Sequence, residues 1–275
     1  MGRTLRTVLR YVLLAGVAAL MVGPFLWMVS TSMMDQSDIF RSPPRWFPAE
    51  FNLRNYRAIM AFLPLGRMFL NSFTIALCAT VGQLASCALA AYAFARMKFR
   101  GHAVLYFILL ATMMIPPQVT MIPVFLIMKS LGWIDTLYAL IVPAFFGGAF
   151  GTFLLRQFFS GIPVDLEDAA RIDGCGRFRI FWQIVLPLSR PALVTLALFT
   201  FMAYWNDLLG PVIYLSSVGK ATLTIGLANL QSDVMTTRYD LLMAGSVLSV
   251  LPILLLFVFG QRWFIRGIAM TGLKE

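Results

Sequence analysis

The sequence predicts an all-α membrane protein with six transmembrane helices. Hydrophobic residues make up 60% of the chain and charged residues only 12%, whereas a soluble domain is usually about 25% charged. A bilayer core about 30 Å thick needs roughly 20 apolar residues per helix. Six windows are long enough, and only the fifth contains a charge, at Asp207: 11–34, 68–95, 101–128, 136–155, 191–219 and 241–261. We therefore expect one transmembrane domain, 1–275.

The positions of Lys and Arg predict the orientation, because cytoplasmic segments are enriched in both. Cytoplasmic termini would place fourteen of the 22 basic residues inside. This N-in/C-in topology makes 35–67 an outer loop and 161–187 a cytoplasmic loop. The outer loop carries five Arg, which argue the other way, but it also holds Asp35, Asp38 and Glu50. Topology thus explains the net charge of +10, and nucleic-acid binding is not needed.

The N-terminal apolar run resembles a secretory signal because Arg3, Arg6 and Arg10 precede it. It is too long for a typical signal core and no small-x-small cleavage site follows, so a retained first helix is expected. The three cysteines do not suggest a disulfide framework, since Cys78 and Cys87 fall inside the second window. One histidine, without clustered ligands, predicts neither a metal site nor a catalytic site.

The long polar break between apolar windows, 161–187, contains a short helix with recognisable ends. Pro163 suits a first helical turn, and Asp165 with Asp168 resembles a weak capping box. The helix should run to about Asp173, where Gly174 supplies a left-handed residue. Small side chains at Ala169 and Ala170 would let another protein approach one face, and aromatic and basic residues follow at 177–182. An amphipathic helix lying on lipid headgroups is the alternative.

The spacing within this segment resembles the coupling loop of ABC importer permeases. Ala169-Ala170, three residues, Gly174, nine residues and Ile184-x-Leu186-Pro187 match the family signature, and Asp168 stands where the family usually has Glu. Further stretches are similar to the carbohydrate-uptake branch, in particular to the second six-span permease subunit of maltose-type and glycerol-phosphate-type systems: 55–56, 71–72, 114–118, 205–207 and 242–245.

The resemblance implies a type I ABC importer permease architecture in a bacterial or archaeal cell (inner) membrane. The implied partners are a second permease subunit, an ABC ATPase dimer, an extracytoplasmic solute-binding protein and membrane lipid. The chain itself should be non-catalytic, because it has no Gly-x4-Gly-Lys-Ser/Thr run. ATP and Mg would be held by the partner ATPase. The implied ATPase-coupling residues are Glu167, Asp168, Ala169, Ala170, Arg171, Asp173, Gly174, Ile184, Leu186 and Pro187.

Polar side chains inside spans are costly and tend to face a watery cavity or the protein interior. We expect these polar side chains, the Pro-Pro break and one aromatic residue to line a translocation pathway. The candidates are Asn71, Thr74, Gln83, Pro116, Pro117, Gln118, Trp205, Asn206 and Asp207. Asp207 could instead be a helix end in solvent, and Trp205 an interface anchor. Small residues at Gly82, Ser86 and Ala90, and at Gly147 and Gly151, predict helix-packing faces.

These patterns favour a permease subunit of an ATP-driven importer for a sugar, oligosaccharide or related polyol. An ion-coupled secondary transporter is the alternative, and it should show intramembrane charge pairs or repeated halves. The sequence has one intramembrane Asp and no evident internal repeat. A scaffold or sensor would not need polar residues on several spans. The coupling-loop spacing decides for the importer.

Overall fold

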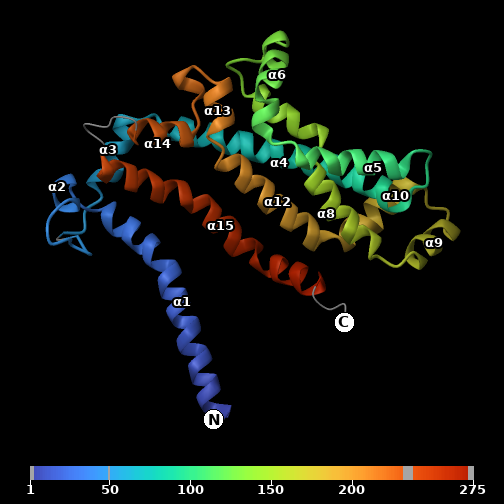
Figure 1. Cartoon of the computed structure of the whole chain (residues 1–275), viewed down its shortest axis with the longest axis horizontal. Coiled ribbons are helices and arrows are strands. Elements are labelled where there is room, and N and C mark those ends of the chain that lie inside the picture. The colour runs from blue at the N-terminus through green and yellow to red at the C-terminus, as the bar shows by residue number, and fades with distance from the viewer. Residues whose placement is uncertain (1–2, 49, 232–237, 272–275) are drawn as a thin grey trace. The chain divides into compact units, whose positions relative to one another are not determined.

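The computed structural model describes residues 3–48, 50–231 and 238–271, with side chains in the last helix described to Gln261. Within these residues the chain is helical and has no strand (Figure 1). The helices are α1 (Arg3–Thr31), α2 (Gln36–Ile39), α3 (Arg54–Phe62), α4 (Leu65–Arg96), α5 (His102–Ala111), α6 (Pro117–Ser130), α7 (Tyr138–Ile141), α8 (Ala149–Ser160), α9 (Asp165–Ile172), α10 (Arg177–Ile180), α11 (Leu186–Leu188), α12 (Arg190–Trp205), α13 (Leu209–Tyr214), α14 (Leu223–Gln231) and α15 (Tyr239–Thr271). Short 3-10 turns cover η1 (Thr112–Met114), η2 (Val142–Phe146) and η4 (Val218–Lys220), and η3 (Phe181–Val185) is a π-helical turn.

The predicted fold class is confirmed, although the spans are less regular than six straight helices. Four helical stretches of the described chain are long and apolar enough to cross a membrane, and two bent pairs bring the number to six. The third span breaks by 102° at Pro116, and the fifth is bent by 78° between α11 and α12. The fifth helix ends at Trp205, so the prediction that it continues to 219 was wrong. The fourth span is interrupted before Ala149.

The chain divides into two compact units, Met1–Gly66 with Ile225–Pro252, and Arg67–Thr224 with Ile253–Glu275. The first unit contains a hydrogen-bonded junction between the end of α1 and α3. The Asn55 side-chain amide donates to the carbonyls of Ser32 and Met34 at 3.0 and 2.8 Å, and the Ser32 and Tyr56 hydroxyls are 2.7 Å apart. Asn55 is buried. It therefore holds α3 against the residues that directly follow α1.

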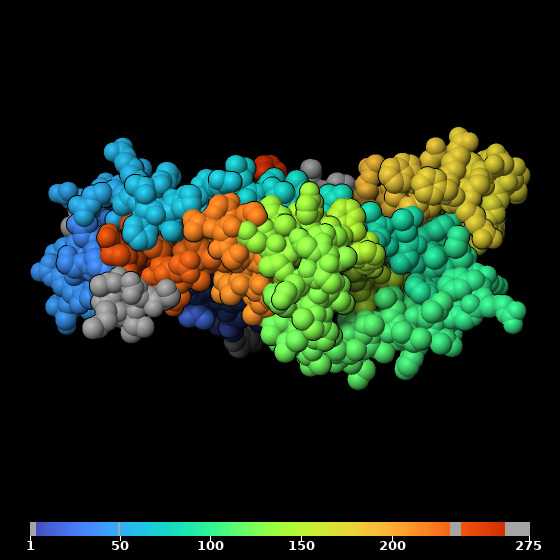
Figure 2. Space-filling model, turned by 90° about the horizontal axis from the view of Figure 1, so that it is seen from above, coloured from blue at the N-terminus to red at the C-terminus, as the bar shows by residue number. Residues whose placement is uncertain are grey.

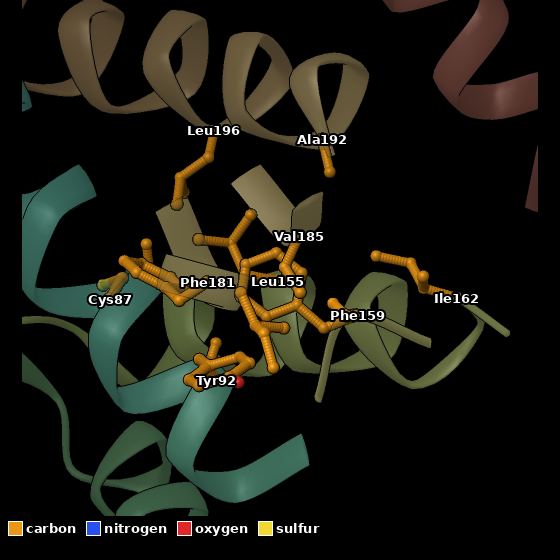
Figure 3. Close-up of a cluster of buried hydrophobic side chains, with 13 residues drawn as sticks. Cys87, Tyr92, Leu155, Phe159, Ile162, Phe181, Val185, Ala192 and Leu196 are labelled. Atoms are coloured by element: carbon orange, nitrogen blue, oxygen red, sulfur yellow. The ribbon is translucent and has the colours of Figure 1, made fainter. Parts of the chain in front are cut away.

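The second unit is built around α4, α8 and α12, whose small and apolar residues form its main core (Figure 3). Small residues permit this packing. A Cβ atom placed on Gly151 would lie 2.8 Å from Cys87 Sγ and 3.1 Å from Leu196 Cδ2, and one on Gly82 would lie 2.4 Å from the Phe145 ring. These contacts confirm the predicted packing role of Gly82 and Gly151.

Candidate functional site

The predicted coupling helix is present as α9, but it begins later than expected. The backbone N–H groups of Glu167 and Asp168 donate to the carbonyl of Val164 at 2.8 and 3.0 Å. Val164 is therefore the N-cap, and it makes no side-chain cap bond. Pro163 precedes the helix, so placing it in the first turn was wrong. The expected capping box is absent from α9, because Asp168 contacts Arg171 at 2.8 Å instead.

The C-terminus of α9 matches the prediction. Gly174 has φ +80°, a left-handed conformation that costs little only for glycine. Its N–H donates to the Arg171 carbonyl at 3.0 Å, and the N–H of Cys175 donates to the Ala170 carbonyl at 2.9 Å. This pair of bonds is a Schellman motif, which satisfies the last carbonyls of the helix and reverses the chain.

One face of α9 is turned into this chain's own core. Ala170 is buried and belongs to the same core cluster as Ile180, Phe181 and Val185, which also includes residues of α4, α8 and α12. We expected Ala170 to leave room for another protein, and that expectation was wrong. Ala169 is exposed. Of the two alanines, only Ala169 is therefore accessible to a partner.

Glu167, also on the inward face of α9, is bound to the end of α4. Its side chain is 1% exposed, and its Oε1 lies 2.7 Å from Nε of Arg96, the last residue of α4. The angle at this contact lies outside hydrogen-bond geometry, so the contact is a close ion pair. Nη2 of Arg96 donates to the Ile162 carbonyl at 2.6 Å. Glu167 thus fixes α9 internally, whereas Asp168 is 56% exposed.

The outward face of the loop carries large apolar side chains beside charged ones. Ile172 is 88% exposed, Phe178 72% and Trp182 63%. The rings of Phe178 and Trp182 stack with centroids 6.5 Å apart. Figure 2 shows this part of the loop in yellow beside the teal end of α4, uncovered on the face in view. Exposed aromatic residues next to Arg are a composition found at protein interfaces.

The second half of the signature shapes the passage into α12. Ile184 and Leu186 pack partly against the core, and Pro187 is exposed at the start of the 78° bend. The π-helical turn over Phe181–Val185 was not predicted. Pro187 could have indicated it, because it has no N–H to make the usual α-helical bond to the carbonyl of Gln183.

The pathway candidates on α4 have different environments. The Asn71 amide donates to the backbone carbonyls of Gly219 and Ala221 at 3.1 and 3.0 Å. Thr74 is exposed, and Gln83 is half-buried close to Gly148. The Asn71 side chain thus binds the segment that contains Gly219 and Ala221, while the Thr74 side chain is exposed in this chain.

The remaining candidates lie at helix ends. Pro116, Pro117 and Gln118 are exposed at the 102° break between α5 and α6. Trp205 is buried, with its ring 5.3 Å from Phe69. At the end of α12 two polar residues follow. Asn206 is exposed and donates to Met202 at 2.9 Å, and the Asp207 carboxylate accepts from the N–H of Gly210 at 3.2 Å. The structure brings no complete solute site together from these residues, and they stay candidates.

An anchor formed by Asp135 was not predicted. This residue has φ +56°. Its carboxylate accepts from the N–H groups of Ser216 and Ser217 at 3.0 and 2.9 Å and lies 3.0 Å from Nζ of Lys220. The Ser217 hydroxyl also donates to it. Hydrogen bonds from Ser217 and Ser216, with that from Lys220, hold the pKa of Asp135 well below its usual range. The partners lie more than 80 residues further along the chain, a separation that no local pattern reveals.

The fold is that of a multi-pass membrane protein, and its loop 161–187 exposes Ile172, Phe178 and Trp182. The model of the family "Binding-protein-dependent transport system inner membrane component" matches residues 84–270, more than half of the chain. The chain therefore belongs to this family. It is a non-catalytic permease subunit of an ABC importer and an inner membrane component.

Named relatives extend over nearly the whole chain. The arabinooligosaccharides transport system permease protein AraQ of Halalkalibacterium halodurans is 34% identical over 282 residues, covering 100% of both chains. The sn-glycerol-3-phosphate transport system permease protein UgpE of Yersinia pestis is 33% identical over 263 residues, covering 93% of each. The osmoprotective compounds uptake permease protein GgtD of Synechocystis is 37% identical over 235 residues, covering 84% of this chain and 78% of that protein.

Two solved structures share the fold. A chain of a bacterial ABC transporter involved in the import of the acidic polysaccharide alginate superposes with a TM-score of 0.84 at 24% identity, covering 96% of this chain and 99% of that one. A chain of an alginate ABC transporter in complex with an alginate pentasaccharide-bound periplasmic protein gives a TM-score of 0.65 at 14% identity, covering 92% of each.

Proposed function

We propose that this subunit forms half of the translocation pathway for a sugar, oligosaccharide or related polyol, and that a partner ABC ATPase drives it through the loop 161–187. The proposal rests on the difference between the two faces of this loop. Its inner face is packed and ion-paired within the chain, while its outer face presents Asp168, Ile172, Phe178 and Trp182. A rigid element with an uncovered apolar surface is suited to receive force from another protein.

The lipid-headgroup alternative for the loop is less well supported. A helix lying on lipid would expose a continuous apolar face along its length. In α9 the exposed apolar residues Leu166 and Ile172 alternate with the exposed charges of Asp165, Asp168 and Arg171, so no continuous apolar face forms. The ion-coupled alternative is set aside, because the family is binding-protein-dependent.

The solute class is supported by the relatives, whose names include arabinooligosaccharides and sn-glycerol-3-phosphate. Another relative is named for osmoprotective compounds, so the common feature is a hydroxylated solute rather than one sugar. We expect the extracytoplasmic solute-binding protein to make the first selection. The exposed Thr74, Gln118 and Asn206 would then contact solute in the pathway.

The proposed assembly contains this subunit, a second permease subunit, an ATPase dimer that binds ATP and Mg, and the solute-binding protein. Cytoplasmic docking of the ATPase requires the N-in/C-in topology expected from the Lys and Arg distribution. The exposed loop supports a contact with one ATPase subunit, and the second permease would supply the corresponding contact to the other.

Isolation of the tagged chain from its native membrane in mild detergent, with partners identified by mass spectrometry, tests the proposal. We expect an ATPase, a second permease and a solute-binding protein. The recovered binding protein is then screened for thermal stabilisation by oligosaccharides, polyols and, as a control, amino acids. Recovery of the chain without an ATPase, under conditions that preserve another ABC importer, would contradict the proposal, and stabilisation by amino acids alone would contradict the solute class.

A further inference from the structure

Helix α4 runs without interruption from Leu65 to Arg96, while the neighbouring spans are broken. The α5–α6 pair is bent by 102° and the segment α10–α12 by 78°. A continuous helix of 32 residues is about 48 Å long at 1.5 Å per residue. It runs along its unit as one stiff element, which Figure 1 shows passing α13 and ending near α10.

The coupling end of α4 is tied to the loop by polar and aromatic contacts. Arg96 forms the buried ion pair with Glu167 of α9 and a hydrogen bond to the Ile162 carbonyl. One turn earlier, Tyr92 packs its ring 5.1 Å from Phe181, and its hydroxyl donates to the Arg177 carbonyl at 3.4 Å. Both helical parts of the loop are therefore connected to the last two turns of α4.

The opposite end of α4 is tied to the segment 216–223. Asn71 donates to the carbonyls of Gly219 and Ala221, and the Ser72 hydroxyl accepts from the N–H of Leu223 at 2.9 Å. The same segment is held by Asp135. A displacement of this end of α4 would therefore carry the segment with it.

We propose that α4 moves as a rigid helix and transmits motion from the coupling loop to the segment 216–223. The Arg96–Glu167 ion pair is the contact that positions α9 on α4. The inference rests on the proposed ATPase coupling. Apolar contacts such as those of Ala170 are non-directional and permit sliding. A buried ion pair is strongly weakened by separation, so it fixes the register of α9 on α4. Besides Arg96, the cation beside Glu167 is Arg171, 3.7 Å away on α9 itself, which cannot tie the two helices together.

The test uses the whole importer in lipid nanodiscs, with Val218→Cys in this chain as a reporter. Val218 is exposed at the tip of the segment 216–223. Its reaction rate with a maleimide is measured with and without MgATP and vanadate, and the parent chain gives the background from Cys78, Cys87 and Cys175. In the otherwise unchanged chain we expect MgATP and vanadate to change the rate. With Glu167→Gln we expect that change to be lost, while the ATPase remains bound and hydrolyses ATP.

Two controls separate transmission from folding. Asp165→Asn removes a carboxylate from the same helix at an exposed position and should leave the change in rate intact. If Glu167→Gln fails to assemble, Arg96→Met combined with Glu167→Gln removes both charges without leaving either unpaired, and it should assemble yet lose the response. A normal response in either assembled variant would overturn the inference, as would an unresponsive Val218→Cys in an active importer. An ATPase missing from the unmodified chain would instead contradict the proposed function.

Discussion

Two adjacent carboxylates in the coupling loop have opposite environments. Glu167 is buried against Arg96, and Asp168 is exposed and paired with Arg171 on its own helix. The sequence predicts that consecutive helix residues point about 100° apart, which is why Glu167 cannot replace Asp168 at the surface. It does not reveal Arg96 as the partner, because 71 residues separate the two (167 minus 96).

Removing these carboxylates should affect stability very differently. Glu167→Ala leaves the Arg96 guanidinium buried without its counter-charge, which costs about 3–5 kcal/mol. Asp168→Ala breaks an exposed pair worth about 0–1 kcal/mol. Thermal unfolding of the purified complex in detergent measures both, and we expect a large fall in Tm for the first substitution alone. Similar values of Tm for the two variants would show that the buried pair does not stabilise the loop.

Asp135 should hold the segment 216–220 across the physiological pH range. Its pKa is lowered because the charged carboxylate accepts from Ser217, Ser216 and Lys220. The stabilisation is therefore fully present above the ordinary aspartate pKa of about 3.9 and is lost as the pH falls below that value towards the lowered pKa. Hydrogen exchange of the peptide covering the segment should be slow at neutral pH and faster in Asp135→Asn. Equal exchange in both proteins at neutral pH would contradict the anchor.

At the scale of helices, much of the architecture could be predicted from the sequence. The lengths of the apolar windows predicted all six spans. The position of Gly174, which can adopt a positive φ, predicted the end of α9. The early end of α12 at Trp205 was missed, because the predicted window continued across Asn206, Asp207 and Gly210-Pro211 into the next apolar stretch. Hydropathy reports that a segment prefers lipid or a core, but it does not report where the backbone changes direction.

Close helix packing at Gly151 provides a test at this scale. Gly151→Val would force a side chain into the space held by Cys87 and Leu196, and overpacking of this kind costs about 1–3 kcal/mol. Gly16→Val is the matched control, because a Cβ on Gly16 meets no atom within 4 Å in this chain. We expect thermal unfolding of the complex to shift to lower temperature for Gly151→Val only. An equal shift for both would indicate an effect of helix propensity rather than of packing.

For the whole molecule, the class could be predicted because the coupling-loop spacing extends over nineteen positions, from Ala169 to Pro187, which few unrelated sequences would match. The predicted capping box is absent because Val164 rather than Asp165 is the N-cap of α9. The pathway was less predictable, since polarity alone does not separate residues that anchor backbone, such as Asn71, from residues open to solute, such as Thr74. The solute depends on partners that this sequence does not encode.

The substitution Gly174→Asp tests whether the loop 161–187 receives the ATPase. The substitution places a side chain at φ +80°, which costs on the order of 1 kcal/mol, and adds a charge to the docking surface. If the strain and the new charge together weaken ATPase binding by about 1.4 kcal/mol, the affinity falls tenfold. Gly132→Asp is the matched control, since Gly132 has φ +70° and lies outside the loop.

The measurement is the amount of ATPase that co-purifies with each variant at equal expression of this chain. We expect at least about tenfold less ATPase with Gly174→Asp than with the unmodified chain, and an unchanged amount with Gly132→Asp. Full recovery of the ATPase with Gly174→Asp, together with normal uptake, would contradict the coupling role of the loop.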